Sequence, residues 1–121
     1  MQCFEPNAAW KDCPVLSLDE LLNIRDAATY LVRVEGDSMQ GAGIHSGDLL
    51  VVSKALEAVR GNIVIAVING EPMCKRLDYR AEQPLLRSEN PQYPPRYIME
   101  GDEFSVWGVV THSVRSHGNS L

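Results

Sequence analysis

The strongest constraint on the fold is a series of short runs rich in β-branched residues, separated by turn residues. The clearest pair is NIVIAVI at 62–68 and EPMCKRLDY at 71–79, joined by Asn69-Gly70. Asparagine and glycine both accept the positive φ of a two-residue turn, so we predict an antiparallel hairpin here. Similar runs are ATYLVRVE (28–35), LLVVS (49–53), PLLRS (84–88) and FSVWGVVTHSV (104–114). The sequence therefore predicts a mostly β fold of twisted antiparallel strands.

Glycine and proline mark where this strand pattern is interrupted. Gly108 lies in the middle of the last run and predicts a bulge there. Pro91, Pro94 and Pro95 exclude a central strand, because proline cannot donate to a sheet, and they predict a surface loop.

The N-terminal part of the chain has a different character. Residues 1–16 contain Pro6 and Pro14 with little periodicity, and we predict an extended arm. SLDELL follows at 17–22, where Ser17 as N-cap and Glu20 three residues later predict one short helix of about two turns. We expect a single domain over residues 17–121, with the arm at 1–16.

Composition excludes several classes of protein. No apolar run approaches the roughly 20 residues that a membrane helix needs, and the start lacks a secretory signal, so we expect a cytoplasmic protein with no membrane contact. The three cysteines are odd in number and widely spaced, which favours reduced thiols over disulfides or a zinc site. The net charge of −5 argues against direct specific binding to nucleic acid, so a role near DNA would depend on protein partners. We expect no cofactor and no metal.

Ser38 in Gly-Asp-Ser-Met at 36–39 is the first candidate for chemistry. It follows a predicted strand and precedes the glycine-rich stretch QGAGIHSGD, where a hydroxyl can project from a turn and nearby N–H groups can bind an oxyanion. The alternative is an ordinary turn in which Asp37 and Ser38 bond to the backbone. The glycines here do not form a phosphate loop, since no Gly-Lys-Ser/Thr follows. We expect Asp37 and Asp48 to orient this loop rather than to act as a catalytic pair.

A serine nucleophile needs a base, and the histidines are weak candidates. His45, His112 and His117 have no acidic residue at a spacing that predicts an orienting partner. Their spacing also differs from that of common metal ligands. We expect them at the surface or at a strand end.

Lys75 is the stronger candidate for the base. Alternation along its strand places Lys75 on one face with Met73 and Leu77, and Cys74 and Arg76 on the other. Apolar surroundings lower the pKa of a lysine, which lets its neutral amine accept a proton. The alternative is that Lys75 extends along the strand into solvent.

Three stretches, taken together, resemble a known family. VEGDSMQGAGIHSGDLLVVSK, GNIVIAVINGEPMCKRL and VWGVVTHSV are similar to the self-cleaving serine peptidases that include LexA, phage repressors and UmuD, with the UmuD-type mutagenesis proteins most similar. The resemblance extends to CFEPNAAW and LSLDELL near the N-terminus. It implies a dimeric, largely β peptidase domain with a Ser-Lys dyad, in which Ser38 is the nucleophile and Lys75 the general base. Gly36, Asp37 and Met39 would support the loop and its oxyanion site.

The resemblance also implies a biological role in the SOS response to DNA damage. In such proteins a RecA filament on single-stranded DNA promotes cleavage of the N-terminal arm. The trimmed dimer then joins a UmuC-like Y-family DNA polymerase in error-prone translesion synthesis. By alignment the cleavage junction falls near Gln2-Cys3, without the usual Cys-Gly or Ala-Gly pair, so this chain resembles the trimmed form. Whether it still cleaves an arm stays open.

Other functions stay open beside this one. The main alternative is the C-terminal self-cleavage and dimerisation domain of a LexA-like or phage-type repressor, although residues 1–27 are too few for a helix-turn-helix. A signal-peptidase relative would share the Ser-Lys chemistry but needs an apolar anchor. A pure interaction module would keep these residues without using them. For the dimer surface we expect the last strand, around Trp107–Val114, with contributions from the N-terminal arm.

Overall fold

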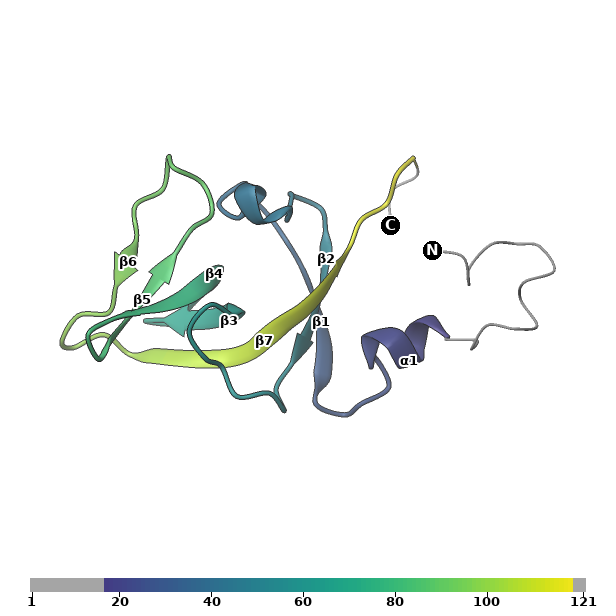
Figure 1. Cartoon of the computed structure of the whole chain (residues 1–121), viewed down its shortest axis with the longest axis horizontal. Coiled ribbons are helices and arrows are strands. Elements are labelled where there is room, and N and C mark those ends of the chain that lie inside the picture. The colour runs from purple at the N-terminus through teal and green to yellow at the C-terminus, as the bar shows by residue number, and fades with distance from the viewer. Residues whose placement is uncertain (1–16, 119–121) are drawn as a thin grey trace.

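Seven strands form one antiparallel sheet in the computed structural model, which describes residues 17–118 (Figure 1). The predicted mostly β fold of antiparallel strands, with one short N-terminal helix, is confirmed. The order across the sheet is β1-β2-β7-β3-β4-β5-β6. The elements are α1 (Leu18–Leu22), β1 (Thr29–Arg33), the 3-10 helix η3 (Gln40–Ala42), β2 (Leu49–Ser53), β3 (Ile63–Ile68), β4 (Glu71–Arg80), β5 (Gln83–Arg87), β6 (Arg96–Tyr97) and β7 (Phe104–Val114).

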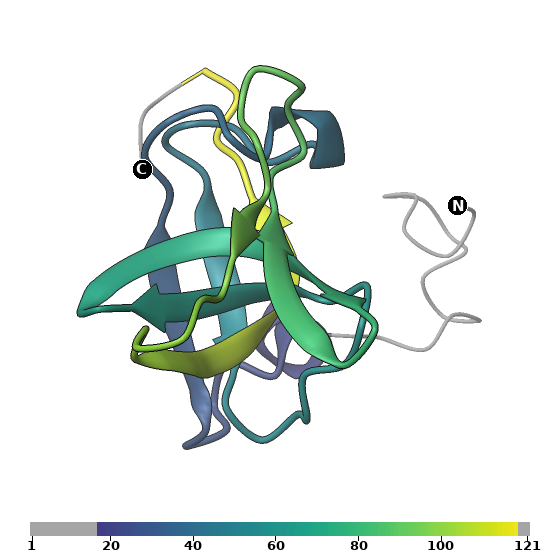
Figure 2. The same ribbon diagram turned by 90° about the vertical axis from the view of Figure 1, so that its left-hand side faces the viewer.

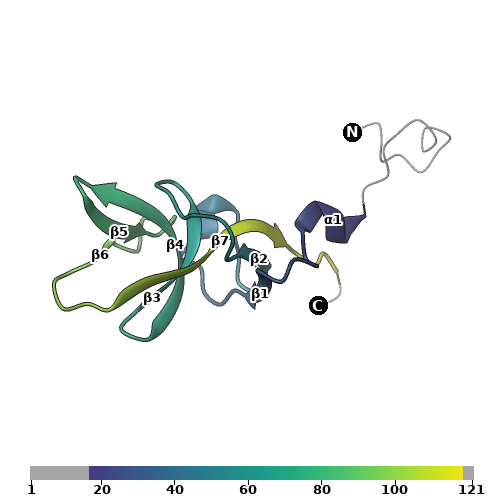
Figure 3. The ribbon, with the colours of Figure 1, turned by 90° about the horizontal axis from the view of Figure 1, so that it is seen from below.

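The long strand β7 joins the two halves of the sheet. Its residues Val109–Val114 pair with β2, and its residues Phe104–Val109 pair with β3. Figure 2 shows β3 and β4 running across the direction of β1 and β2, so the sheet is strongly twisted. Seen from below in Figure 3, α1 lies beside β1 and β2, and β5 and β6 lie at the opposite end.

A bulge in β7 lies where the glycine predicted it. The register with β3 passes from Ile65–Gly108 to Ala66–Val106, which leaves Trp107 as the extra residue. A Cβ atom on Gly108 would lie 2.6 Å from the side chain of Val52, so the close approach of β2 requires glycine here. A second shift, between Val51 and Val52, interrupts the pairing of β2 with β7.

Two groups of buried residues form the core. One lies among β3, β4, β5 and β7 and contains Val64, Ala66, Ile68, Leu77, Leu86 and Val109. The other contains Met39, Ile44, Leu50, Val52 and Ile65. Met39 and Ile44 belong to the connection between β1 and β2, which also carries Ser38. The second group therefore anchors this connection onto the sheet. We call residues 34–48 the Ser38 loop.

Local predictions are confirmed with two differences in detail. Asn69 and Gly70 have φ values of 52° and 82°, and the pairing of Ile68 with Glu71 closes the predicted hairpin. Ser17 caps α1 by accepting the N–H of Glu20, but the helix has five residues, fewer than two turns. The short edge strand β6, in the proline-rich region, and η3 were not predicted.

Two further expectations concern the N-terminal arm and contact with a membrane. The arm at 1–16, with the junction near Gln2-Cys3, lies outside the described residues, so its conformation stays a prediction. Within residues 17–118, the structure contains no helix with the length and apolar character needed to cross a membrane.

Candidate active site

Ser38 and Lys75 line the same cavity, of about 500 Å³. Ser38 comes from the Ser38 loop and Lys75 from the middle of β4, so the fold brings together the two residues that the sequence singled out. Gly36, Asp37 and Met39 line this cavity as well. Much of the remaining wall is apolar and comes from β1, β2, β3 and β4, including Val32, Leu50, Ile65 and Met73.

The local backbone explains how Ser38 is presented. Gly36 has φ +88°, which favours glycine and turns the chain away from β1. Met39, only 2% exposed, packs into the core directly after Ser38. The serine is therefore held between a glycine turn and a buried anchor. Among the described residues, the backbone N–H groups of Ser38 and Met39 donate to no other backbone group of the loops and turns.

Lys75 is half-buried on β4. Burial lowers the pKa of its amine below the ordinary value, and only the neighbouring Cys74 acts in the other direction. Burial also raises the pKa of the Cys74 thiol to about 11, so this thiol is neutral near pH 7. Among the described residues, no carboxylate forms a salt bridge with Lys75. These are conditions under which a lysine can act as a base.

The contacts of the Lys75 amine come from an unexpected part of the chain. Its Nζ donates a hydrogen bond to Ser88 Oγ at 2.9 Å and lies 5.6 Å from the centre of the Tyr93 ring. In the described part of the chain no hydrogen bond joins Lys75 to Ser38. The sequence predicted a surface loop after β5 but gave no sign that Ser88 and Tyr93 reach the site.

The same loop holds the Ser38 side of the cavity. We call residues Ser88–Tyr93 the bracing segment. The N–H of Glu89 donates to Ser38 O (2.8 Å), and the N–H of Gly41 donates to Glu89 O (2.7 Å). Figure 2 shows the β5–β6 connection beside η3, as these bonds require. The bracing segment therefore contacts both candidate residues.

Asp37 receives the other end of the bracing segment. The Tyr93 hydroxyl donates to Asp37 Oδ1 at 2.6 Å, and Asn90 Nδ2 donates to Asp37 O at 3.0 Å. The carboxylate of Asp37 raises the pKa of Tyr93, so this hydroxyl stays a donor at physiological pH. Asp37 is thus bound by two residues that are distant in sequence.

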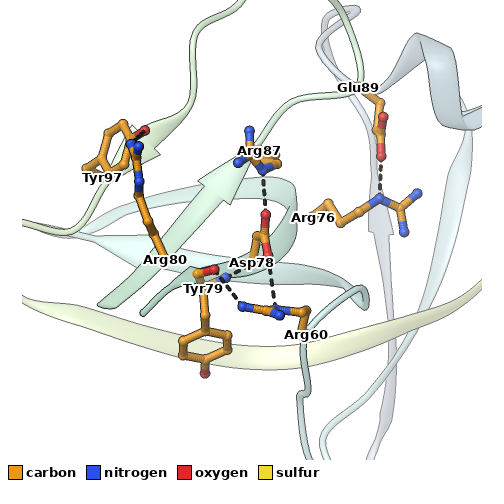
Figure 4. A network of polar contacts seen from close by, with 8 residues as sticks. All are labelled: Arg60, Arg76, Asp78, Tyr79, Arg80, Arg87, Glu89 and Tyr97. Carbon is orange, nitrogen blue, oxygen red and sulfur yellow. Dashed lines mark hydrogen bonds and ion pairs between the residues drawn. The ribbon is translucent and has the colours of Figure 1, made fainter. Parts of the chain in front are cut away.

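An arginine network ties the bracing segment to β4. Arg76 pairs with the carboxylate of Glu89 and donates to Gly61 O at 2.6 Å. Nearby, Asp78 pairs with Arg87 at 2.6 Å and Arg60 at 3.2 Å, as Figure 4 shows. The residue after Lys75 therefore helps to hold the segment whose Ser88 meets the lysine.

An ion pair between a buried carboxylate and a partly exposed arginine holds the far end of the Ser38 loop. Asp48 is 1% exposed, and Arg115 Nε donates to its Oδ1 at 2.8 Å while Arg115 Nη2 donates to its Oδ2 at 2.9 Å. Asp48 also accepts the N–H of His45, and Arg115 donates to Gly43 O. The Arg115 bond is the main cause that lowers the pKa of Asp48 to about 2. Asp48 supports the loop as predicted, whereas Arg115 was not predicted.

Other candidates lie apart from the cavity. None of the three histidines lines it, and within residues 17–118 no group of His, Cys, Asp and Glu is arranged to hold a metal ion. His112 contacts Thr111 on β7, and Trp107 is 51% exposed. Cys3 and Cys13 lie outside the described residues, and Cys74 is a free thiol.

The chain is similar to known proteins over most of its length. The Peptidase S24-like family model matches residues 6–111. Protein MucA from Salmonella typhimurium is 43% identical over 103 residues, which cover 84% of this chain and 70% of MucA. Protein SamA from the same species is 47% identical over 95 residues, covering 76% of the chain and 65% of SamA. A LexA repressor from Bordetella avium is 40% identical over 91 residues, covering 75% of the chain but 43% of the repressor.

Proposed function

The chain belongs to the Peptidase S24-like family, and from this premise we propose that it is a self-cleaving type of serine peptidase with a Ser38-Lys75 dyad. The single observation that carries the proposal is that Ser38 and a half-buried Lys75 with lowered pKa line one cavity. A neutral Lys75 amine would accept the Ser38 proton as Oγ attacks the peptide carbonyl. The backbone N–H groups of Ser38 and Met39 would bind the resulting oxyanion.

The remaining steps use the same groups. The protonated Lys75 would return its proton to the leaving amine as the C–N bond breaks, which leaves an acyl group on Ser38. Lys75 would then accept a proton from water as the water attacks the acyl carbonyl, and Ser38 would recover that proton. The apolar wall of the cavity would exclude water from the amine until the substrate segment is bound, which keeps the amine pKa low.

The dyad is tested by cleavage in trans. The substrate is MucA carrying alanine in place of the serine that aligns with Ser38, incubated with this chain between pH 7 and pH 10. We expect Ser38→Ala and Lys75→Ala each to reduce cleavage by at least about 1,000-fold. Controls are Ser105→Ala, an exposed serine on β7, and Lys54→Ala, whose amine lies 5.5 Å over Tyr30 outside the cavity. Undiminished cleavage by Ser38→Ala or Lys75→Ala would exclude the dyad.

We further propose a UmuD-like role, as an accessory subunit of an error-prone translesion polymerase of the Y family. The family and the resemblance of MucA and SamA over most of this chain support this role. Because the match covers less than half of the LexA repressor, the repressor function is not extended to this chain. A RecA filament would promote cleavage, and a homodimer would bind the polymerase.

The dimer surface proposed is Trp107–Val114. The side chain of Trp107 is half-exposed, and residues beyond Val109 have register partners only on β2. Sedimentation of the wild type and of Trp107→Ala tests the surface, and a wild-type monomer at micromolar concentration would reject the dimer.

Co-purification with a UmuC-like polymerase, and lesion bypass in cells with the wild type and Ser38→Ala, test the accessory role. Bypass that persists with Ser38→Ala would separate polymerase binding from peptidase chemistry.

A further inference from the structure

We propose that Ser88 is a positioning residue for Lys75, whose Oγ accepts one amine N–H and thereby sets the direction of the lone pair that takes the Ser38 proton. This inference rests on the proposed function of the same site. It assigns a role to Ser88, the last residue of the predicted strand run at 84–88, which the sequence did not single out. The observation behind it is the 2.9 Å hydrogen bond from Lys75 Nζ to Ser88 Oγ.

Strand pairing makes the position of Ser88 reproducible. Arg87, the last residue of β5, pairs in register with Arg76 of β4. Because the strands are antiparallel, the residue after Arg87 lies opposite the residue before Arg76. Ser88 and Lys75 therefore lie beside each other where the β4–β5 pairing ends. The contact is thus a consequence of sheet register rather than of a free loop.

The residue after Ser88 holds the nucleophile. Glu89 donates its N–H to Ser38 O and accepts the N–H of Gly41, and its carboxylate pairs with Arg76. Two consecutive residues therefore contact the two members of the dyad. The Ser88 hydroxyl binds the Lys75 amine, and the Glu89 backbone N–H binds the carbonyl of Ser38. The peptide bond between Ser88 and Glu89 thus links the position of the amine to that of Ser38.

The chemistry of a neutral amine explains why an acceptor is needed. The neutral form has two N–H groups and one lone pair, and rotation about the Cε–Nζ bond leaves their directions free. A fixed acceptor for one N–H limits these directions. The Tyr93 ring, whose centre lies 5.6 Å from Nζ, covers another side of the amine. Titratable or charged groups also line this cavity, namely Arg33, Glu35, Asp37, Cys74 and Tyr93. Within the described structure, none of them accepts a hydrogen bond from Nζ, so Ser88 is the acceptor that orients it.

Kinetics in trans, with the MucA substrate described above, test the proposal. Ser88→Ala is expected to lower the limiting kcat at alkaline pH, where the amine is neutral in every variant, by about 10-fold or more. The KM should change less than about twofold, because Ser88 is not required to bind substrate. Ser88→Thr, which keeps the hydroxyl, should restore the limiting kcat, and Ser105→Ala serves as the matched control. A limiting kcat of Ser88→Ala equal to that of the wild type would overturn the proposal.

A second measurement does not depend on activity. The sequence contains three lysines, Lys11, Lys54 and Lys75, so NMR of protein labelled with ¹³Cε lysine follows each amine separately. Ser88→Ala should move the Lys75 titration to lower pH, because the ammonium form loses its acceptor. The Lys54 signal should not move, and an unchanged circular dichroism spectrum would show that the variant is folded. An unchanged Lys75 titration would overturn the contact with Ser88.

The two proposals fail in different ways. If Lys75→Ala cleaves like the wild type, the dyad itself is wrong. If Lys75→Ala is inactive while Ser88→Ala retains the full limiting kcat, the dyad stands and only the role of Ser88 is rejected.

Discussion

The Ser38 loop is held near both ends, by contacts of different chemistry. Near its start, the bracing segment makes backbone hydrogen bonds with Ser38 and Gly41 and a hydroxyl contact with Asp37. At its end, the carboxylate of Asp48 is almost completely buried and bound by Arg115 from beyond β7. The first support consists mainly of neutral groups beside the cavity, whereas the second is a charge pair beneath the loop.

This difference separates two tasks. The Asp48 carboxylate is buried and accepts three hydrogen bonds, and loss of such an acceptor costs more than loss of an exposed ion pair. Neutral contacts at the rim contribute less to stability, but they set the positions of Ser38 and Lys75. We therefore expect changes at Asp48 to reduce mainly the free energy of unfolding and changes in the bracing segment to reduce mainly cleavage.

The largest expected effect is that of Asp48→Ala. It removes the acceptor of Arg115 and of the His45 N–H, and should lower the free energy of unfolding by about 2–3 kcal/mol, the loss typical of hydrogen bonds to a charged group. Urea denaturation followed by circular dichroism measures this loss. Asp78→Ala is the matched control, since Asp78 also binds two arginines but on an open face, and its loss should be smaller. Equal losses would refute the distinction drawn from burial.

The pH dependence of stability is a second test of the contact between Asp48 and Arg115. The pKa of Asp48 falls from 3.8 to about 2 in the folded protein, mainly because of Arg115. A lowered pKa contributes stability that is fully present above pH 3.8 and is lost as the pH falls toward about 2. The difference in melting temperature between the wild type and Asp48→Asn should therefore be constant above about pH 5 and shrink below it. A difference that is independent of pH would exclude this linkage.

Gly41→Ala should have the next largest effect and should act on both properties. A Cβ atom on Gly41 would lie 2.5 Å from Glu89 O, so the bracing segment must move away from η3. We expect a stability loss of about 1–2 kcal/mol, and a loss of cleavage that remains when only folded protein is counted. Gln40→Ala, an exposed change in the same turn, is the control. Wild-type cleavage by folded Gly41→Ala would show that the bracing segment does not position Ser38.

The contacts that make the two supports of the Ser38 loop were not predicted from the sequence, whereas several local features were. The hairpin at Asn69-Gly70 and the bulge at Gly108 follow from local backbone preferences, and alternation along β4 together with family resemblance pointed to Lys75. The contact of Asp48 with Arg115 joins residues 67 positions apart, and that of Asp37 with Tyr93 joins residues 56 apart. Neither contact has a local pattern, because both depend on how the loops pack once the sheet has formed. The roles of Ser38 and Lys75 remain predictions, although both residues line one cavity.

The smallest expected effect distinguishes the ring of Tyr93 from its hydroxyl. Tyr93→Phe removes the hydrogen bond to Asp37 but keeps an aromatic face over the Lys75 amine. We expect its limiting cleavage rate to fall by no more than about threefold, whereas Tyr93→Leu should also move the Lys75 titration to lower pH, because the ammonium loses its cation–π contact. Cleavage rates and the ¹³Cε lysine titration measure the two variants, with the Lys54 signal as internal reference. If Tyr93→Phe reduces cleavage as strongly as Gly41→Ala, the Asp37 contact rather than the backbone bonds of Glu89 aligns the loop. If Tyr93→Leu leaves the Lys75 titration unchanged, the ring does not contribute to the environment of the base, and Ser88 alone orients the amine.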